Sequence, residues 1–450
     1  MRKYPKPLPR GETMTLAERL ATLFAELGLE RAHIAASIAS DWNDLALTRP
    51  DLIASLSLIC PPAVAVDKLS GLECRVRVLC LESAKGFEFL RDADGGHSTL
   101  AVEMLEGYNG LLWSDVAADR PERVIRTITA AASDGRAVGG LQKAAAGSEI
   151  NGIRYRVQGK GPPLLLFPLA LAPSQWDPVT PELAEHFTVI TLSGSELGAA
   201  AMLESRGRCV GYREMVLRVL AKADIRTARR ILEVGCGTGV VTRCIASSCA
   251  AGARVTAVDI NRYLLQEARI LVDRAGLGGT IEVCEGHAER LEFPADSFGA
   301  SVSVTAMEEV DADVMLAELL RVTRPGGRIA VVVRAVDTPR IVNAPLPPTL
   351  KQRVETDRQF TSGAAASGCA DDSLYSRFAN AGLQNVQMFP QLVSYTEPER
   401  VTHLSQRIDG QLSANDKAEW RKAIAAADRA GTLFFSDPLH CAVGTVPDSA

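Results

Sequence analysis

The chain has 450 residues, of which 47% are apolar and 23% are charged, with a formal net charge of -5. This composition is that of an ordinary globular protein, and the length suits two or three domains. Basic residues cluster only within residues 1–13, so no extended nucleic-acid or anionic-membrane surface is expected. The composition therefore favours a small-molecule partner over a nucleic acid or a membrane.

Residues 1–13 are rich in proline and predict a flexible tail, because they lack the apolar core of a signal peptide. The longest apolar run, 164–172, is too short to cross a bilayer. The ten cysteines include no Cys-x-x-Cys pair and no spacing typical of zinc ligands. We therefore expect a cytoplasmic protein with reduced thiols and no metal.

The region 14–197 resembles an α/β-hydrolase whose parts stand in an unusual order. An amphipathic helix over 16–29 comes first. The segments that resemble the second half of that fold follow: the approach to the nucleophile elbow at Glu30–Ser37, the helix and turn after it at Leu45–Asp51, a strand at Val76–Leu81, the histidine loop at Gly107–Trp113 and a closing helix from Asp119. The segments that resemble its opening strands, and the helix and strand after them, come last: Asn151–Gly159, Pro163–Leu166, Ser174–Trp176 and Leu183–Ile190.

This order predicts one circularly permuted α/β-hydrolase-like domain, with residues 14–145 as its C-terminal half and 148–195 as its N-terminal half. The two halves should share one continuous sheet, because neither has enough strands to bury both faces. Termini that lie close together make such a permutation tolerable. A homodimer that exchanges the halves would give the same sequence pattern.

Hydrolysis by this region is not expected. Ile38 stands at the position of the nucleophile and Gly110 at that of the histidine. Phe167 and Pro168 replace the pair that shapes the oxyanion loop, and proline has no N–H to donate. Ser37 lies one residue from the elbow, but no partner histidine follows. We expect a packing or oligomerisation role, with binding of a substrate or a partner chain as the alternative.

The second region centres on a glycine loop. The apolar run 231–234 enters the loop Gly235-Cys236-Gly237-Thr238-Gly239, and a helix is expected from Val240 to Ser248. Alternate glycines let a backbone bend tightly and approach a ligand closely. A second strand ends in Asp259, at the place for an acid that takes the ribose hydroxyls of a nucleoside.

This pairing resembles class I S-adenosylmethionine-dependent methyltransferases. The likeness covers about residues 200–450, where Gly286–Pro294 and Arg321–Arg328 resemble segments of the ubiquinone and menaquinone biosynthesis type. His287 stands where that family usually has aspartate. The resemblance implies S-adenosyl-L-methionine as cofactor, bound through Glu233, Gly235, Cys236, Gly237, Gly239, Asp259, Ile260, His287, Ala288 and Thr305, with Tyr212 either lining the site or simply packing.

The alternation of strands and helices predicts a Rossmann-like methyltransferase domain over 198–450, with a seven-stranded sheet. Gly235, Asp259, His287 and Thr305 would all lie at the carboxyl ends of its strands, where such sheets bind ligands. The proline-rich segment 335–369 is predicted to be a structureless substrate lid.

Methyl transfer requires positioning, and a base only if the acceptor begins protonated. Glu308 and Glu309 are candidates for that base, or else they cap the helix that begins near Asp311. We expect methyl transfer to a small molecule through an O, N, C or S atom that the sequence leaves open. The alternatives are a non-methylating enzyme that binds the same cofactor, such as a cyclase, and a non-catalytic scaffold.

Overall fold

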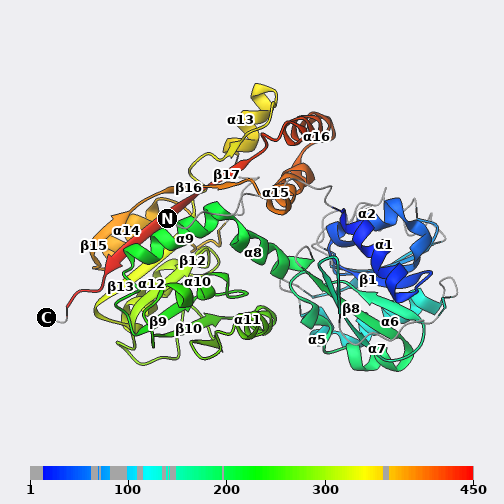
Figure 1. Cartoon of the computed structure of the whole chain (residues 1–450), viewed down its shortest axis with the longest axis horizontal. Coiled ribbons are helices and arrows are strands. Elements are labelled where there is room, and N and C mark those ends of the chain that lie inside the picture. The colour runs from blue at the N-terminus through cyan, green and yellow to red at the C-terminus, as the bar shows by residue number, and fades with distance from the viewer. Residues whose placement is uncertain are drawn as a thin grey trace. The chain divides into compact units, whose positions relative to one another are not determined.

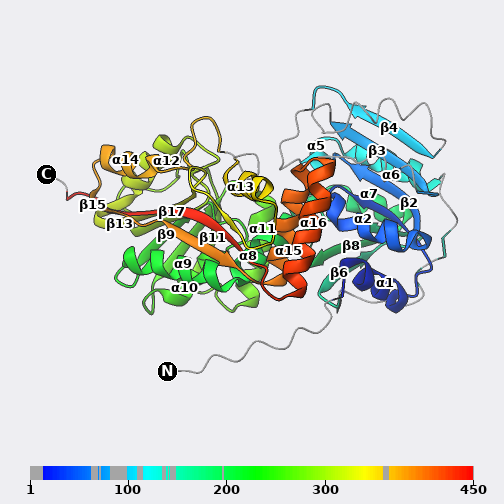
Figure 2. The ribbon, with the colours of Figure 1, turned by 90° about the horizontal axis from the view of Figure 1, so that it is seen from above.

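The computed structural model describes residues 14–61, 69, 72–81, 99–108, 115–133, 138–139, 141, 148–194, 197–357 and 364–448. The chain divides into two compact units, Met1–Ala201 and Met202–Ala450 (Figures 1 and 2). The division falls within helix α8 (Gly198–Arg208), a few residues after the boundary expected from the sequence.

The first unit is built on one sheet with the strand order β4-β3-β2-β1-β7-β8-β6-β5 among its described residues. Pairing is parallel from β4 to β8 and antiparallel between β8, β6 and β5. The strands are β1 (Ala32–Ala36), β2 (Ile53–Ile59), β3 (Arg75–Leu81), β4 (Leu100–Leu105), β5 (Ser148–Ile150), β6 (Ile153–Gln158), β7 (Pro163–Leu166) and β8 (Thr188–Gly194).

The predicted continuous sheet is confirmed, because strand β7 of the later segment lies between β8 and β1. His33, Ile34 and Ala35 of β1 pair with residues 164–166 of β7. All of these pairings form within one chain. Strands β1, β2 and β7 are buried along their whole length, as expected for parallel strands covered on both faces.

Helices cover both faces of this sheet, with α1 and α2 on one side and α6 and α7 on the other (Figure 1). Helix α1 begins with a capping box between Thr15 and Glu18 and ends at Gly28 in the left-handed conformation. The helices are α1 (Leu16–Leu27), α2 (Ala39–Thr48), α5 (Val116–Asp119), α6 (Pro121–Ser133) and α7 (Thr180–His186), with short 3₁₀ turns η1 (Pro50–Leu52) and η2 (Pro173–Trp176).

The expected helix at 45–51 begins earlier, at Ala39, and ends at Thr48. Ile38 precedes it with an ordinary extended backbone, φ -89°, so the chain makes no strained elbow there. The Ser37 hydroxyl is buried and donates to the Cys60 carbonyl at 3.3 Å. Gly110 and the segment 82–86 lie outside the described residues.

The second unit contains a sheet of nine strands among its described residues, with β11-β10-β9-β12-β13-β17-β14 as its main path. Strands β15 and β16 pair with the other side of β17. The strands are β9 (Arg230–Val234), β10 (Arg254–Asp259), β11 (Ile281–Glu285), β12 (Phe298–Val304), β13 (Thr323–Arg334), β14 (Ile341–Val342), β15 (Gln384–Met388), β16 (Gln391–Tyr395) and β17 (Phe435–Thr445).

The expected number of seven strands is wrong, because two of the seven strand positions are each broken in two. Strand β14 continues the line of β13 along one side of β17. Strands β15 and β16 follow one another along the opposite side of β17, interrupted at Phe389 and Pro390. Proline cannot donate to a ladder, which accounts for the break.

Two apolar cores cover the two faces of this sheet, and successive strand residues alternate between them. Ile231 belongs to the core that includes α9, α10 and α11, whereas Leu232 belongs to the core that includes α12 and α14. The helices of this unit are α9 (Val210–Lys222), α10 (Val240–Ser248), α11 (Arg262–Arg274), α12 (Ala312–Val322), α13 (Pro348–Thr356), α14 (Ser373–Asn380), α15 (Pro398–Gln411) and α16 (Ala414–Arg429).

The described parts of the segment 335–369 are not structureless as expected from its prolines, while residues 358–363 of the predicted lid lie outside the described residues. The segment contains strand β14 and helix α13, which begins directly after Pro347. Its end is also ordered: the Ala365 N–H donates to the Glu308 carbonyl at 2.8 Å, and the Cys369 N–H to the Met307 carbonyl at 3.2 Å. Proline here starts a helix, since its fixed φ suits the first helical turn.

Candidate active site

The glycine loop joins β9 to α10 at the carboxyl edge of the second sheet. Gly235 has φ 79°, and a Cβ placed on it would lie 2.1 Å from the Cβ of Ala306. Only glycine fits there, because a side chain would meet the loop after β12. The N–H groups of Gly235 and Cys236 donate to the Val258 carbonyl at 2.8 and 3.0 Å, which ties the loop to β10.

Asp259 ends β10 beside this loop. Its Oδ2 accepts from the Gly237 N–H at 2.7 Å, and its Oδ1 accepts from the Asn261 N–H at 2.9 Å. Burial raises the pKa of the Asp259 carboxyl, while these backbone donors favour its charged form. Each carboxylate oxygen keeps a further lone pair, so the group can still accept from two hydroxyls.

Glu233 lies inside the sheet rather than at the open edge. Its side chain is buried and accepts a hydrogen bond from the Thr242 hydroxyl of α10. Burial raises the pKa of Glu233 to about 8, although the hydrogen bond from Thr242 acts in the opposite direction. The predicted cofactor residue Glu233 therefore fixes helix α10 against β9, just behind the glycine loop.

The other residues predicted to surround the adenine lie at the same edge. Ile260 follows Asp259 and is 59% exposed, a large exposure for an isoleucine. His287 and Ala288 lie in the turn after β11, where His287 is exposed and forms an isolated bridge with Arg290. The structure thus brings Ile260, His287 and Ala288 to the edge that carries Asp259, as their order in the sequence predicts.

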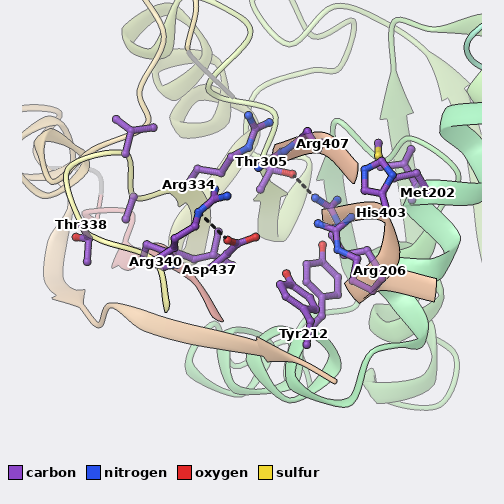
Figure 3. Close-up of a pocket in the computed structure, with 17 residues that line it drawn as sticks. Met202, Arg206, Tyr212, Thr305, Arg334, Thr338, Arg340, His403, Arg407 and Asp437 are labelled. Atoms are coloured by element: carbon purple, nitrogen blue, oxygen red, sulfur yellow. Dashed lines mark hydrogen bonds and ion pairs between the residues drawn. The ribbon is translucent and has the colours of Figure 1, made fainter. Parts of the chain in front are cut away.

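Thr305 follows β12 with φ 58°, a left-handed conformation that is uncommon for a β-branched residue. Its N–H donates to the Val332 carbonyl at 2.8 Å, which holds it between the ends of two strands. Its hydroxyl lies 3.5 Å from Arg206 Nη1 (Figure 3). Such strain is concentrated at functional sites, and Thr305 lines the cavity described below.

Glu308 and Glu309, which the sequence predicts as a base or as helix caps, do not cap helix α12. Asp311 itself caps α12, accepting from the N–H groups of residues 313 and 314, so neither Glu308 nor Glu309 is the cap. Glu308 is fully buried and forms an ion pair with Arg334 at 2.7 Å, and the Arg334 N–H donates to it at 2.5 Å. The Glu309 side chain is 53% exposed and lies 3.7 Å from Arg334.

A cavity of about 130 Å³ opens at the carboxyl ends of β12 and β13 (Figure 3). Neither Glu308 nor Glu309 lines it, so the structure does not bring these predicted catalytic residues to the cavity wall. Tyr212 lines the cavity and is also buried in the apolar core around α9 and α10. The walls of the cavity come from α8, α9, the segment after β13, α15 and the beginning of β17.

The basic residues of this cavity are not predicted from the sequence motifs. Five arginines and one histidine line it, against a single acidic residue: Arg206, Arg334, Arg340, Arg400, Arg407, His403 and Asp437. One signal was available, because Arg400, His403 and Arg407 are spaced by three and four residues and share one face of α15. The remaining residues come from elements far apart in the chain.

The residues at the strand edge fit S-adenosyl-L-methionine. The glycine loop leaves no room for a Cβ at Gly235, and Asp259 is held with acceptor capacity to spare. Ile260 presents an exposed apolar surface beside that acid, which suits an adenine ring. The bound cofactor supplies an activated sulfonium methyl group. Asp259 and the glycine loop would position the nucleoside, and Glu233 would hold helix α10 and the loop in place behind it.

Comparison with known proteins supports this interpretation. Residues 231–327 match the family model described as a methyltransferase domain. That match begins in β9 and ends in β13, so it contains the glycine loop, Asp259, His287 and Thr305. The second unit therefore has the Rossmann-like fold of a class I methyltransferase.

Two curated relatives have the same kind of name. The chain is 33% identical over 123 residues to the ubiquinone/menaquinone biosynthesis C-methyltransferase UbiE of Hahella chejuensis, covering 27% of this chain and 49% of that one. It is 30% identical over 135 residues to methyltransferase phqN of Penicillium fellutanum, covering 30% and 41%. The chain thus spans about half the length, or less, of these relatives.

A solved structure, the YcgJ protein from Bacillus subtilis, is similar at 18% identity with a TM-score of 0.36, covering 52% of this chain and 99% of that one. Within the described residues, no helix is both long and apolar enough to cross a membrane.

Proposed function

We propose that the second unit transfers a methyl group from S-adenosyl-L-methionine to a small-molecule acceptor. The observation that carries the proposal is the joint placement of the glycine loop and Asp259, whose carboxylate accepts the Gly237 N–H at 2.7 Å. The cavity supplies the second part, because it lies at the same strand edge and includes Thr305. The match to a methyltransferase domain over 231–327 supports the same reaction.

The chain's own residues account for the steps that the acceptor requires. Tyr212 and Thr305 line the cavity wall and can orient the acceptor, while buried surroundings exclude water. His403 also lines the cavity, and burial, followed by the charges of Arg400 and Arg407, lowers its pKa to about 4. It is therefore neutral at pH 7 and offers a ring nitrogen that can take part in a hydrogen bond with the acceptor.

Cofactor binding is tested by titration calorimetry with S-adenosylhomocysteine. The Asp259→Ala variant should bind about tenfold to 100-fold more weakly, since it leaves ligand hydroxyls without an acceptor. The matched control is Glu282→Ala, which removes an exposed carboxylate from the neighbouring strand β11. Equal affinity in wild type and Asp259→Ala would refute the proposed site.

We further propose that the first unit is a degenerate, circularly permuted α/β-hydrolase-like domain without hydrolytic activity. The strand order supports it: taking β5 to β8 first and β1 to β4 second gives the order 1-2-4-3-5-6-7-8 with the second strand antiparallel. Ile38, with its ordinary φ, stands at the elbow in place of a nucleophile. We therefore assign this unit a binding or assembly role.

A further inference from the structure

Basic residues outnumber acidic ones along the described wall of the cavity beside Thr305, where five arginines and one histidine face the single acid Asp437. Among its lining residues, Arg334 has Glu308 as its partner at 2.7 Å. Arg340 forms a longer ion pair with Asp437, whose Oδ1 lies 3.5 Å from Arg340 Nε (Figure 3). No other acidic residue lines this wall in the described part of the chain.

Two of these arginines are deeply buried and incompletely bonded. Arg340 is 5% exposed, and its Nε and Nη1 atoms make no hydrogen bond to any described residue. Arg400 is 8% exposed, and its Nε likewise has no hydrogen-bond partner among the described residues. Buried guanidinium donors without acceptors are costly, because desolvation is not compensated.

Aromatic rings hold two of the cations in place. The guanidinium of Arg400 lies 5.0 Å from the centre of the Tyr395 ring, and that of Arg206 lies 4.8 Å from the centre of the Tyr212 ring. Such stacking fixes the plane of a guanidinium and leaves its edge N–H groups free to meet a ligand. The arginines are therefore arranged for binding at their edges.

The cations also disfavour one another. Burial and then the charge of Arg340 lower the pKa of Arg407 to about 10. Because like charges raise the energy of the empty cavity, an anion that enters it removes an existing penalty in addition to forming new hydrogen bonds.

We propose that the methyl acceptor is an oxyanion, a small molecule with a carboxylate or phosphate group that is bound by Arg340, Arg400 and Arg407. Arginine forks match the planar geometry of these groups and can bind them through two parallel hydrogen bonds. The proposal rests on the proposed function, because it assigns the cavity to the acceptor of that same reaction. It narrows the acceptor from any small molecule to an acidic one.

The test measures thermal stabilisation of the full chain, saturated with S-adenosylhomocysteine, by three probes at matched ionic strength: benzoate, phenyl phosphate and the uncharged benzamide. We expect benzoate, phenyl phosphate or both to raise Tm by about 2–4 °C, and benzamide to leave it unchanged. The anion that stabilises more strongly identifies the source as a carboxylate or a phosphate. Equal shifts with all three probes, or no shift with either anion, would overturn the proposal.

Substitution of the cavity arginines tests whether the anion binds in this cavity. Arg400→Gln and Arg340→Gln should each weaken the effective anion by at least about tenfold, since each removes a donor pair. Arg421→Gln is the matched control, because it removes an arginine from the exposed surface of α16, paired with Asp409 and outside the cavity. Undiminished binding in both cavity variants would place the anion elsewhere and refute the assignment. If one variant fails to fold, the other variant and the wild-type comparison of benzoate with benzamide still decide.

The two proposals fail in different ways. Intact S-adenosylhomocysteine binding without anion binding would refute the oxyanion proposal alone. Anion binding without S-adenosylhomocysteine binding, measured without the cofactor product, would refute methyl transfer and leave an anion site.

Discussion

In the first unit, strand β1 is followed by Ser37 and Ile38, whereas β9 in the second unit is followed by a run of alternating glycines. Both strands are buried and parallel, and both lead into a helix within a few residues. The difference lies in the turn: Ile38 has φ -89°, and Gly235 has φ 79°. Two sheets of similar design thus offer very different chemistry, because function depends on the residues placed at the strand ends.

The largest effect is expected from the buried ion pair behind the cavity. Glu308→Ala leaves Arg334 without its 2.7 Å partner and should lower the free energy of unfolding of the second unit by about 3–5 kcal/mol. Glu309→Ala, which removes a half-exposed neighbour, should change it by about 0.5 kcal/mol or less. Urea denaturation measures both. Similar losses would contradict the structural role of Glu308.

The glycine turn that distinguishes the second unit is tested by a matched pair. Gly235→Ala should weaken S-adenosylhomocysteine binding by about 100-fold, because its Cβ would displace the loop at Ala306. Gly276→Ala has a similar φ, 67°, but open space around it, so it should cost only about 1 kcal/mol of stability and leave affinity intact. Calorimetry would contradict this account if both variants bound like the wild type.

A smaller, pH-dependent effect is expected from Glu233. Its pKa of about 8 in the folded state exceeds the ordinary 4.5, so the folded chain holds a proton that the unfolded chain releases. Its favourable contribution is complete below about pH 4.5 and is lost as the pH rises through 8. Relative to Glu233→Gln, the wild type should lose roughly 1–3 kcal/mol of unfolding free energy over this range. Urea titrations from pH 5 to pH 8 would show a constant difference if Glu233 were ionised throughout.

The smallest effect is expected in the first unit. The wild type and Ser37→Ala should hydrolyse p-nitrophenyl acetate at the same background rate, because the serine hydroxyl donates to the Cys60 carbonyl and is buried. The variant should lose only about 0.5–1.5 kcal/mol of stability, the contribution of one hydrogen bond. Hydrolysis that disappears with Ser37 would show that the first unit is an enzyme after all.

Features that depend on residues close in the sequence could be predicted, whereas a site that depends on the convergence of distant residues could not. The glycine loop and Asp259 lie on adjacent strands and carry a fixed spacing, so their meeting could be predicted. The sheet of the first unit could also be predicted, since each half alone had too few strands. The cationic cavity could not, because Arg206, Arg340 and Arg400 come from three elements whose convergence depends on the fold.

Two errors had a common physical origin. Prolines at 345, 347 and 348 predicted an irregular lid, but Pro347 and Pro348 stand where a helix begins, a position that proline favours. The place of Glu308 in the sequence predicts a helix cap or a base, but tertiary packing buries its side chain beside Arg334. Local composition limits the conformations that a segment can adopt, and the residues packed around it determine which of them it adopts.

Strand β17 has a consequence for how the second unit is assembled during synthesis. It pairs with β13 and β14 on one side and with β15 and β16 on the other, and yet it follows all of them in the chain. The position between β13 and the edge strands β15 and β16 is therefore filled last, and until then Val331 and its neighbours expose an unpaired edge. Such late, long-range pairing is slow and leaves nascent chains open to aggregation. Asp437 and Leu439 arrive on the same strand, so the cavity wall is completed only when the sheet is.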